Sequence, residues 1–115
     1  MKKTDTLKKN YEFRNVLSKG TYYSGEYLDI LVKKNRQEKN LLGIAISVKI
    51  GKAVKRNRIK RLIRENYRLI EDNVITGYTI VFLWKKHKDI SFATFHNIRK
   101  DMNKIFKKAN LFIEK

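Results

Sequence analysis

The first apolar pattern in the chain has the spacing of a helix. Phe13, Val16 and Leu17 recur at i, i+3 and i+4 within the segment NYEFRNVLSKG, which predicts a short helix. We expect the side chain of Asn10 to cap the first turn of this helix. We also expect Gly20 to end it in the left-handed conformation that glycine adopts easily.

The next apolar runs have the composition of strands. EYLDILVKK (residues 26–34) and the run from Leu41 to Val48 flank the polar loop NRQEKN, and both are rich in β-forming residues. The short loop favours an antiparallel hairpin between them. A third strand, YTIVFLW at residues 78–84, is apolar on both faces, as in a strand at the centre of a sheet.

Two longer helices complete the pattern. One is predicted from soon after Gly51 to about Asp72, and the last one begins with Ser91 as its N-cap. The apolar stripe of the last helix contains Phe92, Phe95, Ile98, Met102, Ile105 and Phe106. The order α-β-β-α-β-α favours an α+β sandwich, in which helices pack on one small sheet. At 115 residues the chain is expected to form a single domain, residues 1–115.

The charge of the chain narrows the class of partner. Lys and Arg number 28 against 11 Asp and Glu, which gives a formal charge of +17 at pH 7. Such an excess repels itself in a compact fold unless a polyanion screens it. Nucleic acid is the leading candidate and an anionic membrane surface is the second. A solvated lysine-rich surface is the alternative that needs no partner.

Several classes of protein are disfavoured by what the sequence lacks. It has no cysteine, which excludes disulfides and thiolate metal sites and is compatible with a reducing cytoplasm. No apolar run approaches the roughly 20 residues that span a bilayer. The basic N-terminus MKKTDTLKKN is not followed by an apolar segment, so it does not read as a secretory signal.

The helix predicted after Gly51 has two contrasting faces. At about 100° per residue, one face is apolar and would pack on the sheet, with Tyr67 at its margin. The apolar face contains Ile59, Leu62, Ile63 and Ile70. The opposite face is a polar stripe of Asn57, Arg61, Arg64 and Arg68. Lys60 flanks this stripe, Arg56 and Arg58 lie near its borders, and Lys55 lies at the entry of the helix.

This arrangement of charge is unfavourable without a partner. Arg64 has like-charged neighbours four residues away on both sides, Lys60 and Arg68, and each such pair costs roughly 0.2–0.5 kcal/mol. Lys52, Lys55 and Arg56 lie in or near the first turn, where the helix dipole disfavours cations. Phosphates would reverse both penalties, and the planar fork of arginine grips them bidentately. A solvated amphipathic helix remains the alternative, whereas a membrane-surface helix is disfavoured because the apolar face lacks Trp and Phe.

The kind of nucleic acid is not decided by charge. No tight turn leads into a second recognition helix, which disfavours a DNA-binding regulator of the helix-turn-helix type. Aromatic residues are interleaved with basic ones, as suits stacking on unpaired RNA bases. Taken one by one, however, Phe13, Phe92, Phe95 and Phe106 are more often core residues. A structural RNA-binding protein of ribosomal type is the rival hypothesis.

No catalytic constellation is visible in the sequence. His87 and His96 are nine residues apart and lack the spacing of zinc ligands or of an acid–base pair. Glu71 and Asp72 are the only adjacent acids, and neighbouring helical residues point about 100° apart. We find no nucleophile beside an orienting base. Any catalysis would therefore come from a partner.

The segment GIAISVKIGKAVKRNRIKRLIREN carries a specific resemblance. It is similar to the signature of the bacterial ribonuclease P protein component, whose core Gly-x-Ala-Val-x-Arg-Asn-Arg-x-Lys-Arg is matched from Gly51 through Arg61. The similarity extends to the opening KKNYEFRNVLSKG, the strand order and the aromatic-ended last helix. It implies a small α/β sandwich, ribosomal-protein-S5-like, with a left-handed βαβ crossover around the basic helix. This hand is rare in proteins.

The resemblance also implies a function. The partner would be a large catalytic RNA that uses Mg²⁺ to remove the 5′ leader of precursor tRNA, so the chemistry would reside in the RNA. The protein would bind that RNA and, through a central cleft, the leader. It would thereby favour precursor over mature tRNA and lower the metal requirement. We expect a cytoplasmic protein with no membrane contact and no stable protein partner.

The site residues follow from the same resemblance, position by position. The expected RNA-binding residues are Ser47, Lys49, Lys52, Lys55, Arg56, Asn57, Arg58, Lys60, Arg61, Arg64 and Arg68. Lys52 replaces an asparagine that is common in the family. The expected leader cleft contains Phe13, Leu17, Leu31 and Phe112. Leu17 and Leu31 stand where relatives often carry aromatics, so apolar contact rather than stacking is expected there. The resemblance makes Phe13 a cleft residue, while Phe92, Phe95 and Phe106 are still expected in the core.

Overall fold

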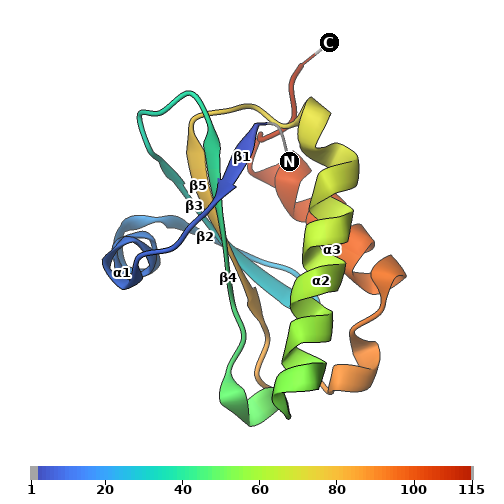
Figure 1. Cartoon of the computed structure of the whole chain (residues 1–115). Helices are drawn as coiled ribbons and strands as arrows, with labels where there is room; N and C mark the ends of the chain where they lie inside the picture. Colours follow the sequence, from blue (N-terminus) through green and yellow to red (C-terminus); the bar gives the residue numbers. More distant parts are fainter. Residues whose placement is uncertain (1–2, 115) are drawn as a thin grey trace.

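A five-stranded sheet with helices on both faces forms the body of the protein (Figure 1), described for residues 3–114 by a computed structural model. In chain order the elements are β1 (Thr4–Thr6), α1 (Asn10–Lys19), β2 (Thr21–Ser24), β3 (Leu28–Lys34), β4 (Asn40–Ala45), α2 (Ala53–Ile70), β5 (Tyr78–Trp84) and α3 (Phe95–Lys108). The predicted α+β sandwich is confirmed. The short strands β1 and β2 were not predicted, because TDT and TYYS carry no apolar alternation.

The strand β5 lies at the centre of the sheet, as its apolar residues predict. The order is β1-β4-β5-β3-β2, with β5 antiparallel to β3 and parallel to β4. The predicted hairpin between residues 26–34 and 41–48 is therefore wrong. Four successive residues of β5, Thr79 to Phe82, are buried, so both faces of this strand are covered. Such burial is typical of a strand inside a sheet, and β5 lies between β3 and β4.

The basic helix α2 connects two adjacent parallel strands. The chain leaves β4, returns along α2 on one face of the sheet and enters β5 next to β4 (Figure 1). Followed from β4 through α2 to β5 in Figure 1, this βαβ connection is left-handed, as the resemblance implied, and that hand is rare among such crossovers. Helix α3 packs beside α2 on the same face, while α1 crosses the opposite face alone (Figure 1).

The two faces of the sheet carry separate apolar cores. The larger core lies under α2 and α3 and includes the buried residues Leu28, Ile30, Ile59, Ile63, Tyr67, Ile80, Phe82, Ile98 and Phe106. The smaller core lies under α1 and consists of Leu7, Val16, Leu31 and Val81. Because α1 is short and alone, it leaves much of its face of the sheet uncovered.

The ends of two helices differ from the sequence-based expectation. Lys9 rather than Asn10 precedes the first turn of α1, and Gly20 is extended, with φ of −73°. Glycine is needed at position 20 for space, since a Cβ there would lie 2.6 Å from the carbonyl oxygen of Val16. Helix α3 begins at Phe95, and Thr94 caps it by accepting a hydrogen bond from the Asn97 N–H at 3.1 Å. Ser91 lies in a separate 3₁₀ turn, Ile90–Phe92.

The expected core aromatics divide into two groups. Phe106 is fully buried, as predicted. Phe92 and Phe95 are 46% and 36% exposed, so the core assignment is wrong for both. Phe92 precedes α3 and Phe95 is its first residue, so the period of the later turns does not fix which way these two side chains point. Phe92 instead stacks on Tyr27, with 5.6 Å between ring centroids.

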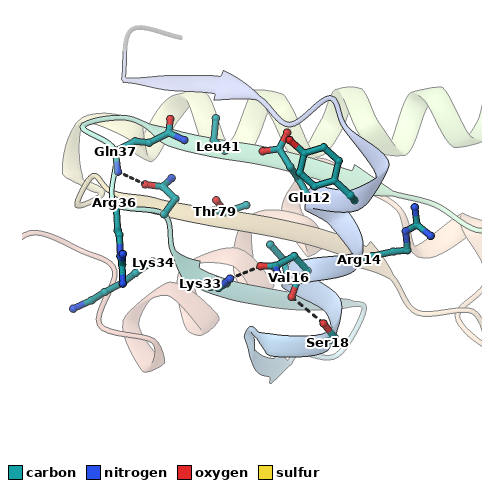
Figure 2. Close-up of a pocket in the computed structure, with 13 residues that line it drawn as sticks. Glu12, Arg14, Val16, Ser18, Lys33, Lys34, Arg36, Gln37, Leu41 and Thr79 are labelled. Carbon is teal, nitrogen blue, oxygen red and sulfur yellow. Dashed lines mark hydrogen bonds between the residues drawn. The ribbon is translucent and has the colours of Figure 1, made fainter.

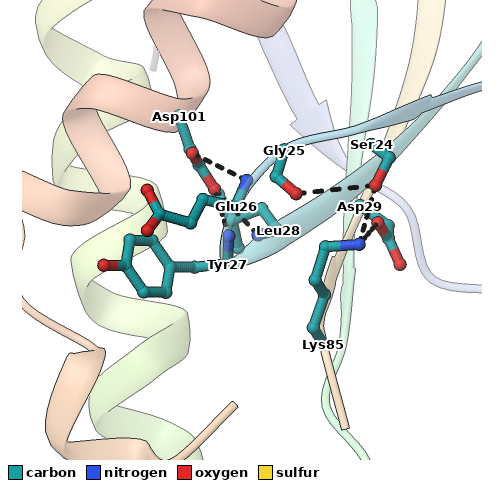
Figure 3. A network of polar contacts seen from close by, with 8 residues as sticks. All are labelled: Ser24, Gly25, Glu26, Tyr27, Leu28, Asp29, Lys85 and Asp101. Carbon is teal, nitrogen blue, oxygen red and sulfur yellow. Dashed lines mark hydrogen bonds and ion pairs between the residues drawn. The ribbon is translucent and has the colours of Figure 1, made fainter. Parts of the chain in front are cut away.

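One buried carboxylate ties α3 to the turn between β2 and β3. Asp101 accepts hydrogen bonds from the N–H groups of Glu26, Tyr27 and Leu28, at 3.1, 2.6 and 2.9 Å (Figure 3). Beside this turn, Lys85 Nζ lies 2.7 Å from Asp29 Oδ1 and 2.7 Å from Ser24 Oγ (Figure 3). These contacts fix the edge of the sheet that carries β2.

A second buried polar cluster secures β1 at the opposite edge. The hydroxyl of Tyr67 lies 2.8 Å from Thr4 Oγ1 and 3.3 Å from the donor Asn40 Nδ2. Burial raises the pKa of Tyr67 and outweighs these hydrogen bonds, which act in the opposite direction. Within residues 3–114, no helix combines the length and apolarity needed to cross a membrane.

Candidate nucleic-acid interface

The helix α2 has the two faces that its sequence predicts. Ile59, Leu62 and Ile63 are buried against the sheet and α3. Tyr67, expected at the margin of this face, is fully buried, whereas Ile70 is only half-buried. The arginine stripe of α2, which we define as Asn57, Arg61, Arg64 and Arg68, is exposed. Arg61 Nε lies 3.6 Å from Glu65 Oε1, and both side chains are largely in solvent, so this ion pair contributes little stability.

The start of α2 concentrates positive charge. Lys52 is the N-cap, no side chain caps the first turn, and that turn contains no acid. Arg56 Nε donates a hydrogen bond to the Gly51 carbonyl at 3.1 Å, which turns this side chain back over the start of the helix. Unpaired N–H groups and cations at a helix N-terminus together form a good environment for phosphate oxygens.

The 3₁₀ turn before α2 carries two further candidates. Ser47 accepts a hydrogen bond from the Lys49 N–H at 3.3 Å, so its side chain shapes the turn Val48–Ile50. Lys49 is exposed. On the other side of the helix entry, the N–H of Ser91 donates to Asp89 and lowers the pKa of that carboxyl, and the cation of Lys55 acts in the same direction.

On the α1 face of the sheet, two of the expected cleft residues lie together. Phe13 and Leu17 line a hollow of about 500 Å³ with Asn10, Arg14, Ile44 and Ala45. Ala45 also lines a neighbouring hollow of about 670 Å³ that includes Tyr22, Ser47, Lys86 and His87. Because the two hollows meet at Ala45, we treat them as one surface, the Phe13 cleft. This surface leads from α1 to the turn that precedes α2.

The other two expected cleft residues lie elsewhere. Leu31 is only 5% exposed and belongs to the small core beneath α1. Phe112 packs against Phe106, with 5.8 Å between ring centroids, on the face of the sheet that α2 and α3 cover. The structure therefore brings Phe13 and Leu17 together on the α1 face but leaves Phe112 on the other face.

Sequence reasoning missed several residues of the Phe13 cleft. Tyr22 is 55% exposed and points to the α1 face from β2, a strand that the sequence pattern did not predict. Lys86 and His87 follow the end of β5, and only the central position of that strand could have placed them here. Gly43 lies beneath the ring of Phe13, and a glycine inside an apolar strand was the one signal of such a close approach.

The donor groups of the protein do not assemble a metal site. In the part of the chain that the structure describes, residues 3–114, no three His, Asp or Glu side chains gather as a potential metal-binding group. His87 and His96 are both exposed and come from separate elements.

Taken together, these features define a small basic α+β protein that presents an arginine helix on one layer and an aromatic-lined cleft on the other. A family profile described as ribonuclease P matches residues 1–110. The chain is 40% identical over 113 residues to the ribonuclease P protein component of Clostridioides difficile (strain 630), covering 96% of each chain.

Solved structures agree with this relationship. The Staphylococcus aureus RNase P protein superimposes with a TM-score of 0.81 at 28% identity, covering 94% of this chain and 97% of that one. The RNase P protein from Thermotoga maritima gives a TM-score of 0.78 at 26% identity, covering 96% and 99%. The chain belongs to the ribonuclease P protein family. Its role is that of the protein subunit of this endoribonuclease in tRNA 5′ processing.

Proposed function

We propose that the protein docks on the catalytic RNA of ribonuclease P through the arginine stripe and the start of α2. The observation that carries this proposal is the stripe itself, three arginines exposed along one helix face while the opposite face is buried. Lys60 is half-buried beside the stripe, and Arg58 is exposed near its border. Ser47, Lys49, Lys52, Lys55 and Arg56 extend the basic surface around the helix entry.

The Phe13 cleft is proposed to bind the 5′ leader of precursor tRNA. Its apolar floor and the half-buried ring of Phe13 suit contact with an unpaired base, because bases stack on aromatic faces whatever their sequence. Arg14 and Lys86 at the margin suit the phosphates that join such bases. Leu17 would give apolar contact only. The complex would thereby retain precursor in preference to mature tRNA, which has no leader.

The same proposal places the chemistry in the RNA. Mg²⁺ would serve the RNA subunit, because the described residues offer no carboxylate cluster of the kind that such an ion needs. The protein's contribution is then to raise the affinity for substrate, which lowers the concentration of metal ion that the complex requires. We place this activity in the cytoplasm, where tRNA is matured, without a stable protein partner.

A reconstituted cleavage assay tests the proposed function. Precursor tRNA is incubated with the cognate RNA subunit at low Mg²⁺, with and without the protein. We expect faster cleavage with the protein. We also expect the protein to raise the affinity of the complex for precursor tRNA more than its affinity for mature tRNA. Absence of any stimulation, together with recovery of ribosomal RNA on purification from cells, would instead support a ribosomal type of RNA-binding protein.

A further inference from the structure

A second hollow lies on the other side of α1 from the Phe13 cleft. It has a volume of about 900 Å³ and lies between α1 and the β3–β4 turn (Figure 2). Its floor is formed by Leu41 of β4 and Thr79 of β5. We call this hollow the Lys34 groove. None of its lining residues belongs to the arginine stripe or to the start of α2.

The Lys34 groove is strongly basic. Arg14, Lys33, Lys34 and Arg36 line it, and Glu12 is the one acid among its lining residues. Around these cations stand the neutral hydrogen-bonding side chains of Asn15, Ser18, Asn35 and Gln37 (Figure 2). Tyr11, 61% exposed, stands at the rim. Cations, amides and an exposed ring together match the phosphates and bases of a single nucleic-acid strand.

Internal contacts hold this groove in shape. Lys33 Nζ is hydrogen-bonded to Asn15 Oδ1, which links the β3 wall to α1 (Figure 2). In the β3–β4 turn, Asn35 Oδ1 accepts from the Gln37 N–H at 2.8 Å, and the Asn35 N–H donates to the Gly77 carbonyl at 2.9 Å. Arg36 sits between them with φ of +60°, a left-handed conformation that is uncommon for a residue with a side chain. The turn is therefore a fixed support for cations.

Arg14 connects this groove to the Phe13 cleft, because the same side chain lines both hollows. A strand that lies in the Phe13 cleft can thus pass Arg14 at α1 and meet cations again beyond the helix. We infer that the Lys34 groove binds the upstream part of long 5′ leaders, as a second single-strand site in series with the Phe13 cleft. This inference rests on the proposed function of that cleft.

The position of the groove favours the leader over the catalytic RNA as its occupant. The arginine stripe faces away from the sheet on the layer of α2 and α3, whereas the Lys34 groove lies on the layer of α1. A structured RNA docked on α2 would have to wrap around an edge of the sheet to enter the groove. A single strand that already lies in the Phe13 cleft reaches it by continuing along the same face.

The test compares two leader lengths in the reconstituted complex of protein and RNA subunit. The short leader has about 4 nucleotides and the long one about 16, which are the smallest and largest single-strand site sizes of one OB fold. The variant Lys34→Gln/Arg36→Gln removes two exposed charges from the groove. As a matched control, Lys104→Gln/Lys108→Gln removes two exposed charges from α3.

We expect the groove variant to bind the long-leader precursor about five- to tenfold more weakly, and to bind the short-leader precursor as tightly as the unmodified protein does. The salt dependence of binding should decrease for the long leader only. The control should bind both precursors as the unmodified protein does.

Three outcomes would overturn the inference. Equal loss for both leaders, or no loss for either, would show that the groove does not hold upstream leader. Weaker binding of the RNA subunit alone would assign the groove to that RNA. Phe13→Ala, assayed in parallel, separates this inference from the proposed function. If Phe13→Ala weakens both leaders but the groove variant weakens neither, only the second site is refuted. If Phe13→Ala leaves both leaders unaffected, the leader assignment of the first cleft fails.

Discussion

The aromatic ring of Phe13 lies against the backbone of Gly43. A Cβ at position 43 would stand 2.7 Å from Cε1 and 2.8 Å from Cζ of that ring, closer than carbon atoms can approach. It would also stand 2.9 Å from Leu7 Cδ2. Because Gly43 has no side chain, the ring of Phe13 can lie directly on the backbone of β4 and the floor of the cleft stays open.

A Gly43→Ala variant should change the cleft without touching the arginine stripe. The added methyl group displaces the Phe13 ring, so we expect weaker binding of precursor tRNA that carries a leader. Affinity for the RNA subunit alone should stay unchanged. Equilibrium binding to both RNAs measures the two effects. Circular dichroism is the control for folding, because overpacking of this kind typically costs about 1–3 kcal/mol. Unchanged affinity for precursor in a folded variant would contradict the role of this contact.

The Phe13→Ala variant removes the ring itself. We expect the affinity for leader-bearing precursor to fall by about tenfold, since stacking on one base is worth about 1–3 kcal/mol. Binding of mature tRNA should not change. Phe112→Ala provides the comparison, because that ring packs on Phe106 on the other face of the sheet. It should lower the free energy of unfolding while leaving the preference for precursor intact. If Phe13→Ala weakens precursor and mature tRNA equally, the ring is a packing residue.

The Arg61→Ala/Arg64→Ala variant tests the arginine stripe. Each phosphate contact that is lost lowers the slope of log K against log salt by about 0.7–0.9, so the pair should lower it by about 1.5. Titrations of the RNA subunit at several salt concentrations measure this slope. Lys100→Ala/Lys104→Ala on α3 removes the same charge from exposed positions outside the stripe. A slope equal to that of the unmodified protein would mean that Arg61 and Arg64 stay in solvent in the complex.

The Asp101→Asn variant should destabilise the protein without changing its RNA-binding residues. The carboxylate accepts hydrogen bonds from three backbone N–H groups. In asparagine an NH₂ group replaces one of the two oxygens, and this donor cannot accept a hydrogen bond from the N–H groups that it faces. We expect a loss of about 1.5–3 kcal/mol in the free energy of unfolding, the range for hydrogen bonds to a charged group. Urea denaturation measures it. Asp72→Asn, at an exposed position, is the matched control and should change little. Equal midpoints for both variants would refute the anchoring role of Asp101.

Because Tyr67 is buried, the protein should lose stability against unfolding at alkaline pH. Its pKa is raised from the ordinary value of 10.0, mainly by burial, so the folded protein holds this proton more tightly than the unfolded chain does. The stabilisation is fully present below pH 10 and is lost as the pH rises through the folded pKa. We expect the difference in unfolding free energy between the protein and Tyr67→Phe to shrink or reverse above that pH. At neutral pH the variant should be about 1 kcal/mol less stable, because Thr4 and Asn40 lose a partner. A difference independent of pH would contradict this assignment.

How far the sequence predicts this molecule depends on the element. The helix α2 was predicted closely because Ile59, Ile63 and Tyr67 repeat with one period against a charged face. The pairing of β3 with β4 was predicted wrongly because strand patterns reveal which residues are buried and do not reveal which strands are neighbours. The start of α3 was misplaced because Ser91 and Thr94 are both good caps, and only the chain path decides between them.

The site shows the same division. The stripe on α2 could be read from spacing within one helix, and the Arg56-Asn57-Arg58 signature gave its family. The Phe13 cleft joins α1, β2, β4 and the end of β5, so its members are far apart in sequence. Only the resemblance placed Phe112 with Phe13. Phe13 lies on α1, whereas Phe112 follows α3, and these two helices cover opposite faces of the sheet.

The central place of β5 also constrains how the chain acquires its structure during synthesis. β3 and β4 are each paired with β5, and β1 reaches the sheet only through β4. Until residue 84 has left the ribosome, β3 and β4 have no shared partner and α2 has no complete surface to pack on. The basic helix would therefore emerge ahead of its scaffold, with its apolar side uncovered. Folding is accordingly expected to be late and cooperative, and to depend on contacts between distant parts of the chain.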